Sequence, residues 1–145
     1  MTILDYFNSA KIKTLATVDQ NGQPNVCPCG TATMTDDHTI IIGCVGILRS
    51  RENIRQTRKA TFLVQKPIDP EYWKQYEKTG EKPYPAGYRL YCAFIEETED
   101  KTIVAPIYEK LKKRVGGRIA EKIASAMKFK VEEVREISSN KQLQE

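Results

Sequence analysis

The sequence lacks several features that would assign it quickly to a class. Its 145 residues contain one histidine, one tryptophan and no apolar run near the ~20 residues that a membrane-spanning helix needs. Lys and Arg number 23 and Asp and Glu number 19, so the net charge of +4 is too small to indicate nucleic-acid binding by itself. The composition predicts a single domain over residues 1–145 and leaves its chemistry open.

Two common nucleotide-binding motifs are also absent. The chain has no Gly-Lys-Ser or Gly-Lys-Thr, which excludes a Walker A loop, and it has no dinucleotide fingerprint.

The opening segment, MTILDYFNSAKIK, lacks the basic-then-apolar order of a secretory signal. We therefore expect a cytoplasmic protein that has no membrane association.

The four cysteines do not predict a disulfide framework. Cys27 and Cys29 fall on one face of a predicted strand, because side chains alternate with a period of two. Their spacing is not that of a zinc knuckle, and the chain has only one histidine. We expect no metal and interpret the cysteines as small apolar residues, with a redox pair or an iron–sulfur site as the alternative.

Strand patterns dominate the chain, and Asn21-Gly22 predicts a tight turn between the first two strands. The run 39–45 is the most apolar, which predicts a strand buried on both faces. Together the patterns predict six strands, at 13–18, 24–34, 39–45, 60–65, 88–95 and 128–137. Because tight turns join most of them, we expect a mainly β fold, an antiparallel sheet closed as a small barrel with flanking helices.

Helices are expected at the start of the chain, with Thr2 as the cap, and at 48–58, with Ser50 as the cap. Pro106 is expected to open a long helix. An apolar residue every fourth position would drift about 200° around a straight helix over five steps, so we predict a break at Gly116-Gly117.

The segment 66–87 differs from the rest in its prolines and tyrosines and is expected to be a turn-rich insertion. Within it, Asp69 and Pro70 predict the start of a short helix. Its aromatic residues suit either internal packing or contact with a ligand or second subunit. The polar residues 138–145 are expected to form a flexible tail.

One local arrangement suits an anion. The strand that ends at Gly43 leads through Gly46 into a helix that carries Arg49 and Ser50 near its start. A helix N-terminus presents unpaired N–H groups and the positive end of a dipole, so phosphate binding is one interpretation. An ordinary capped helix with solvated arginines is the other.

The run 13–64 resembles the FMN-binding split-barrel proteins, the family related to pyridoxamine 5′-phosphate oxidase. The resemblance is carried by the segments Thr14–Val18, Asn21–Pro28, Ile40–Gly43, Arg49-Ser50 with Asn53-Ile54, and Ala60–Val64. It implies a six-stranded antiparallel split barrel that forms a homodimer, with FMN at the interface.

The resemblance also implies roles for particular residues. The flavin ring would lie along Cys27, Pro28, Cys29 and Gly30, and it would be flanked by Gly43, Cys44 and Val45. The phosphate would be held by Arg49 and Ser50, with Asn53 close behind. No catalytic acid or base is assigned.

Two departures from the family pattern argue against oxidation of pyridoxamine phosphate itself. Family members with that activity carry a basic residue near the position of Cys27 and a lysine at the position of Ser50. The resemblance therefore implies an FMN-dependent oxidoreductase or electron carrier acting on an unassigned small substrate. The alternatives are a split barrel that binds a deazaflavin or haem, and a non-catalytic binding or nucleic-acid module.

Overall fold

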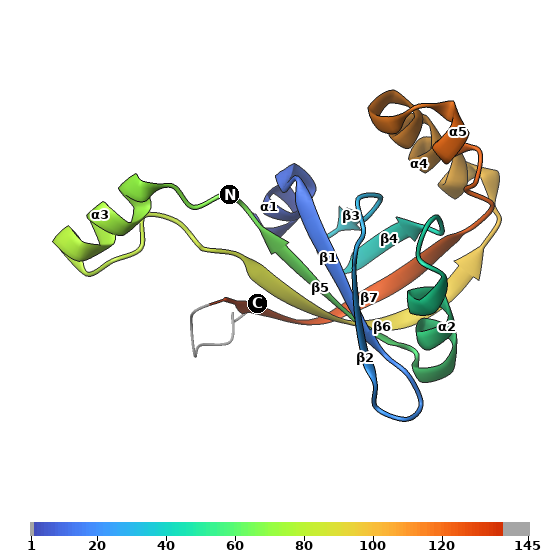
Figure 1. Cartoon of the computed structure of the whole chain (residues 1–145), viewed down its shortest axis with the longest axis horizontal. Coiled ribbons are helices and arrows are strands. Elements are labelled where there is room, and N and C mark those ends of the chain that lie inside the picture. The colour runs from blue at the N-terminus through green and yellow to red at the C-terminus, as the bar shows by residue number, and fades with distance from the viewer. Residues whose placement is uncertain (1, 138–145) are drawn as a thin grey trace.

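A computed structural model describes residues 2–137, so the predicted tail 138–145 lies outside the described residues. One antiparallel sheet dominates the fold, with the strand order β2-β1-β5-β6-β7-β4-β3 (Figure 1). The strands are β1 (Ile12–Val18), β2 (Pro24–Pro28), β3 (Thr33–Asp36), β4 (Thr39–Gly43), β5 (Lys59–Gln65), β6 (Tyr88–Thr98) and β7 (Ala126–Glu136).

The sheet has seven strands, not the six predicted, because the strand expected at 24–34 is two strands. Pro28 ends β2, and β3 begins at Thr33. β2 and β3 are the opposite edges of the sheet, yet only residues 29–32 separate them. Five chain steps span at most ~18 Å, whereas the edges of a flat seven-stranded sheet would lie ~29 Å apart. The sheet must therefore curl strongly, although its edges do not pair to close it.

The core lies on the inner face of this curled sheet. Its largest fully buried side chains include Phe7, Leu15, Phe62 and Phe129. Phe62 packs edge-to-face against both Phe7 and Phe129, with ring centroids 6.1 and 5.5 Å apart. The predicted double burial of the 39–45 run is wrong on one face, because Ile40 and Ile42 are fully buried whereas Thr39, Ile41 and Val45 on the other face are only half-buried.

The strand β7 contains a bulge opposite β6. Tyr91 of β6 pairs with Glu133, and the next residue, Cys92, pairs with Val131. Residue 132 is therefore the extra residue, and it brings Val134 onto the buried face that Phe129 and Val131 already share.

Helices α1 (Ile3–Ser9) and α2 (Leu48–Thr57) precede β1 and β5. Thr2 caps α1 as predicted, in a capping box with Asp5. The prediction that Ser50 caps α2 is wrong, because the helix begins at Leu48 with Ile47 at the cap position and no capping side chain. Ser50 lies inside the helix and its side chain is buried.

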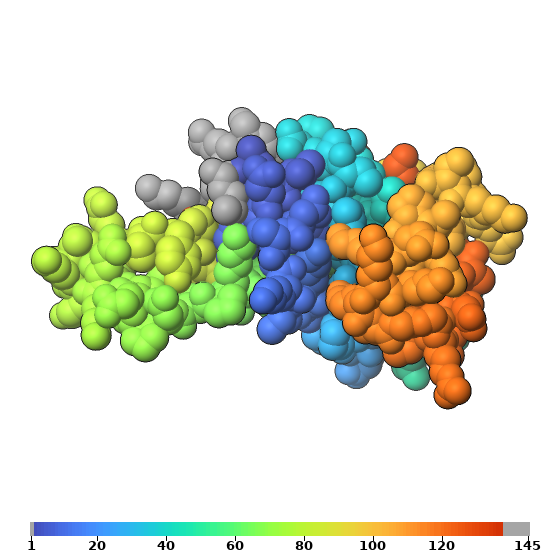
Figure 2. Space-filling view, turned by 90° about the horizontal axis from the view of Figure 1, so that it is seen from above, coloured from blue at the N-terminus to red at the C-terminus, as the bar shows by residue number. Residues whose placement is uncertain are grey.

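The segment 66–87 forms an arm that carries α3 (Pro70–Thr79) away from the sheet (Figure 1). In the space-filling view it protrudes as a separate lobe (Figure 2). Asp69 caps α3 as predicted, with Oδ1 accepting from the Tyr72 amide at 3.0 Å. Tyr72 is buried against Trp73 and Tyr84, so at least part of this aromatic cluster serves internal packing.

Helices α4 (Lys101–Val115) and α5 (Gly117–Ala120) lie at the other end of the molecule from α3 (Figures 1 and 2). Pro106 does not open the helix, because Asp100 accepts from the Thr102 amide at 2.9 Å and caps it one turn and a half earlier. The predicted break is confirmed, since Gly116 takes φ +93° between α4 and α5. No helix among residues 2–137 is both long and apolar enough to cross a bilayer.

Candidate functional site

A polar cluster joins the β1–β2 hairpin to the first turns of α2. The Ser50 hydroxyl accepts from Asn25 Nδ2 at 3.0 Å and lies 3.1 Å from the Cys27 sulfur. One turn later, Asn53 Nδ2 donates to Thr17 Oγ1 at 3.1 Å. Asn25, Cys27 and Thr17 can meet α2 in this way because alternate residues of a hairpin point to the same face. Ser50 and Asn53 therefore hold the helix against the sheet.

The start of α2 is open to an anion. With no capping side chain, the N–H groups of Leu48, Arg49 and Ser50 have no acceptor among residues 2–137. The Arg49 side chain is exposed and has no polar partner in the same part of the chain. Unpaired N–H groups beside a free guanidinium are the elements of a phosphate site.

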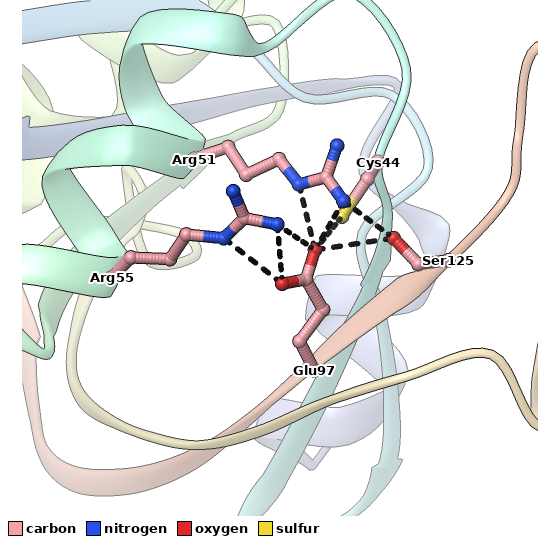
Figure 3. A network of polar contacts seen from close by, with 5 residues as sticks. All are labelled: Cys44, Arg51, Arg55, Glu97 and Ser125. Carbon is pink, nitrogen blue, oxygen red and sulfur yellow. Dashed lines mark hydrogen bonds and ion pairs between the residues drawn. The ribbon is translucent and has the colours of Figure 1, made fainter.

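A second network lies on the other side of α2 (Figure 3). Arg51 Nε donates to Glu97 Oε1 at 2.6 Å, and Arg55 Nη2 lies 2.8 Å from Glu97 Oε2. The Ser125 hydroxyl donates to the same carboxylate at 3.2 Å. Burial raises the pKa of Glu97, but hydrogen bonds from Arg55 and Arg51 outweigh it and lower the pKa overall. The network ties α2 to β6 and to the start of β7.

The loop 29–32, which crosses between the sheet edges, is fixed by side chains from three directions. Lys13 Nζ donates to the Ala32 carbonyl at 2.8 Å, and Arg114 Nη1 donates to the Gly30 carbonyl at 3.1 Å. The Thr31 hydroxyl accepts from the Gly43 amide at 3.0 Å. The loop is therefore held beside the end of β4.

Lys13 is the most unusual charge in this region, because its side chain is buried and makes no ion pair among the described residues. Burial lowers its pKa to about 8, and the positive charges of Lys110 and Arg114 act in the same direction. A lysine at an inward-facing position of a strand was a visible signal in the sequence. It was not singled out there.

The cysteines do not gather into a metal site. No group of three or more His, Cys, Asp and Glu side chains in the described part of the chain is placed to hold a metal ion. Burial raises the pKa of Cys29 and Cys92 to about 12 and also raises the pKa of Cys44. Cys27 is the half-exposed member of the set.

A cavity of about 600 Å³ opens between α4 and the β3–β4 hairpin. Its walls are Thr33 and Ile41 on the sheet side and Ile103, Ile107 and Leu111 on the helix side. Lys110, Lys113 and Arg114 also line the cavity. No pattern in the sequence indicated this cavity, because the helix and the hairpin lie far apart in the chain.

Six of the ten residues predicted to bind a cofactor fall into two groups. Cys27, Ser50 and Asn53 belong to the polar cluster, with Arg49 at the open helix start. Gly30 and Gly43 meet at the crossing loop through Thr31. By exposure, Pro28, Gly30 and Arg49 are exposed and Cys27 and Val45 half-buried, whereas Cys29, Gly43, Cys44, Ser50 and Asn53 are buried.

Comparisons by sequence give no match. No model of a known protein family matches the chain. A search of curated proteins finds no relative either.

Comparisons by structure do match. An FMN-binding protein from Syntrophomonas wolfei subsp. wolfei aligns over 95% of this chain and 84% of its own, with TM-score 0.72 and 21% identity. The chain has the split-barrel fold. HupZ from Group A Streptococcus aligns with this split barrel over 99% of both chains, with TM-score 0.71 and 21% identity.

A third neighbour of the split barrel is a protein from Clostridium acetobutylicum related to general stress protein 26, of the pyridoxinephosphate oxidase family. It covers 96% of this chain and 89% of its own, with TM-score 0.64 and 15% identity. An F420 reductase (TM-score 0.62) and HutZ, a haem storage protein from Vibrio cholerae (TM-score 0.51), share the fold too. The resemblance inferred from the sequence is confirmed at the level of fold.

Proposed function

We propose that this split barrel is an FMN-binding flavoprotein that acts as an oxidoreductase or electron carrier. The observation that carries the proposal is the start of α2, where Arg49 and three unpaired N–H groups lie together. The fold is shared with an FMN-binding protein, which supports the same ligand. Bound FMN would supply hydride or electron transfer at its ring.

The residues present suit the phosphate end of FMN. The Arg49 guanidinium would bind the phosphate with the N–H groups of Leu48 to Ser50. The Ser50 hydroxyl and the Asn53 amide would act indirectly, since both are engaged with the β1–β2 hairpin. They fix the helix whose first turn receives the phosphate.

We propose that the ring lies beside the exposed backbone of Pro28 and Gly30. In the proposed site Cys27 and Val45 would flank it, both half-buried. Gly43 and Cys44 would lie beside the ring, and the space next to the Gly43 Cα is filled by Ile107 of α4 and by Ile123.

A homodimer is part of the proposal, and the outer face of the sheet supports it. The register aligns Val26 with Ala16, Ala16 with Thr61, and Thr61 with Tyr91, so these four side chains form one row across β2, β1, β5 and β6. Val26 is 64% exposed and the other three are half-exposed. A second copy would bury this row.

The oligomeric state is tested by light scattering after gel filtration. The expected mass is twice the 16.6 kDa of the chain. Val26→Arg should shift the protein toward the monomer, because a buried unpaired charge is costly. Val115→Arg, at an exposed position on α4, is the control and should leave the dimer intact.

The flavin is tested by titrating the purified protein with FMN and following the visible absorbance and fluorescence of the flavin. Arg49→Ala should weaken binding about 30-fold, which corresponds to about 2 kcal/mol for a lost charge-assisted contact. Arg118→Ala is the matched control, since Arg118 is an exposed arginine on α5. It should bind FMN as the unaltered protein does.

Four outcomes would contradict the proposal. If the protein binds no FMN, the proposed ligand is wrong. If Arg49→Ala binds FMN with the affinity of the unaltered protein, the proposed phosphate site at the start of α2 is wrong. Tighter binding of F420 or haem in competition would assign the fold to one of those ligands. Salt-sensitive binding of nucleic acid without any flavin binding would favour a non-catalytic module.

A further inference from the structure

The cavity between α4 and the β3–β4 hairpin combines an apolar body with a cationic rim. Ile41, Ile103, Ile107 and Leu111 form the apolar part. Lys110, Lys113 and Arg114 line one side of it from consecutive turns of α4. At about 600 Å³ the cavity is large enough for a small organic molecule.

The cations around this cavity have no counter-charge. No carboxylate lines it, and among residues 2–137 neither Lys110 nor Lys113 has an ion-pair partner. Arg114 donates one hydrogen bond, from Nη1 to the Gly30 carbonyl, and its other N–H groups are available to a ligand. Lys13, behind the same loop, adds a fourth positive charge that feels Lys110 and Arg114. Like charges brought together in this way repel one another unless an anion binds among them.

Hydrogen bonds to the loop 29–32 anchor two of these four cations, Lys13 and Arg114. The Gly30 backbone lies so close to Arg114 that a Cβ there would stand 2.5 Å from Nη2. Lys13 and Arg114 fix neighbouring carbonyls of the loop 29–32, which forms part of the cavity wall. The loop that forms part of the cavity wall is therefore tied both to β1 and to α4.

We propose that this cavity binds a small molecule that has an apolar body and one carboxylate or phosphate group. Its apolar part would contact the isoleucines and Leu111, and its anionic group would bind Lys110 and Lys113 beside Arg114. The site goes beyond the proposed flavin site: Gly30 borders both, but the anionic group would bind on α4, whereas the FMN phosphate would bind at the start of α2.

The test uses the purified full chain and two fluorescent probes, anilinonaphthalene sulfonate, which is anionic, and N-phenylnaphthylamine, which is neutral. Both should bind saturably, and the anionic probe should bind more weakly as salt rises. The double variant Lys110→Ala with Lys113→Ala should lower the affinity for the anionic probe by about tenfold or more. Its affinity for the neutral probe should fall by less than about twofold. Both positions are exposed on a helix, so the fold should be unaffected.

Two further variants locate the site. Thr35→Trp, at an exposed lining position on β3, should remove both probes by filling the cavity. Arg118→Ala with Lys122→Ala removes two exposed cations outside the cavity and should change neither. Competition by phenylacetate and by phenyl phosphate then shows which anionic group is preferred.

Several results would overturn the proposal. The first is the absence of saturable binding of the anionic probe. The second is that the control pair weakens binding of this probe as much as the Lys110→Ala and Lys113→Ala pair does. The third is that the Thr35→Trp variant still binds the probes. This would be the flavin site instead if FMN displaced the probe and the double variant Lys110→Ala with Lys113→Ala lost the binding of both FMN and the probe. Failure of FMN binding alone, with the probe still bound, would remove the flavin proposal and leave this one intact.

Discussion

The Cys27 sulfur lies 3.1 Å from the Ser50 hydroxyl and so joins the edge strand β2 to the first turn of α2. This contact places a half-exposed thiol beside the proposed flavin phosphate site. It also accounts for the orientation of Ser50, which faces the sheet instead of capping its own helix.

We expect Cys27 to be the reactive thiol of the native protein. The other three cysteines are buried, and burial raises the pKa of each. Ellman's reagent at pH 8 should therefore titrate one thiol rapidly and the others only after denaturation. Cys27→Ser should abolish the rapid phase and leave FMN affinity unchanged, whereas Cys92→Ser should keep both. A rapid phase that persists in Cys27→Ser would contradict this assignment.

Glu97 should stabilise the fold in a pH-dependent way. Its carboxylate receives both Arg51 and Arg55, and Glu97→Gln should lower the free energy of unfolding at pH 7 by roughly 1–2 kcal/mol. Because its pKa is lowered in the folded state, the contribution is present above the ordinary pKa of 4.5 and is lost as pH falls further.

Urea unfolding at pH 7 and pH 3 tests this prediction. The difference between Glu97→Gln and the unaltered protein should shrink at the lower pH. Glu132→Gln, which removes an exposed ion pair with Lys59, is the control and should cost under about 0.5 kcal/mol. Equal effects of the two variants would show that the network adds nothing to an ordinary surface pair.

The buried charge of Lys13 should lower the free energy of unfolding at neutral pH, and this destabilising effect should become smaller as the pH rises. Its pKa falls from 10.5 in the unfolded chain to about 8 in the fold, so the unfolded state binds more protons between these values. The free energy of unfolding should rise through this window by at most about 1.4 kcal/mol per pH unit relative to Lys13→Met. Unfolding curves of both proteins at pH 7.5, 8.5 and 9.5 measure the difference. A constant difference would exclude a lowered pKa.

Two glycines near the site should respond differently to a methyl group. A Cβ at Gly43 would stand 2.8 Å from Ile107 Cγ2 and 3.3 Å from Ile123 Cδ1, both packed side chains. Gly43→Ala should therefore destabilise the fold by about 1–3 kcal/mol. Gly30→Ala meets only the Arg114 guanidinium, the end of a flexible exposed side chain, and should cost under about 1 kcal/mol. Thermal unfolding ranks the two, and the reverse order would contradict the packing described here.

Local signals in the sequence predicted the elements that local interactions control. Thr2 and Asp69 were assigned as caps and act as caps, since a capping side chain bonds within three residues. The helix break at Gly116 was also predicted, because glycine has the freedom that φ +93° requires.

The errors occur where distant groups compete with local preference. Ser50 was assigned as a cap, but Asn25 and Cys27 occupy its hydroxyl. Pro106 was assigned to a helix start, but the Asp100 cap starts the helix earlier and the proline is accommodated within it. The strand predicted at 88–95 was ended too early, since β6 continues to Thr98 and two arginines from α2 hold Glu97 near its end.

The sequence by itself determined the alternation of strands, the caps and the resemblance to split-barrel proteins, because these depend on side-chain period and on neighbours a few residues away. Only the tertiary structure decided that residues 24–36 supply both edges of the sheet. The loop 29–32 is too short for a flat sheet, so the sheet curls, and the curl brings Lys13, Gly30 and Gly43 together. The cationic cavity under α4 follows from that curl, since its walls come from segments about 70 residues apart in the chain.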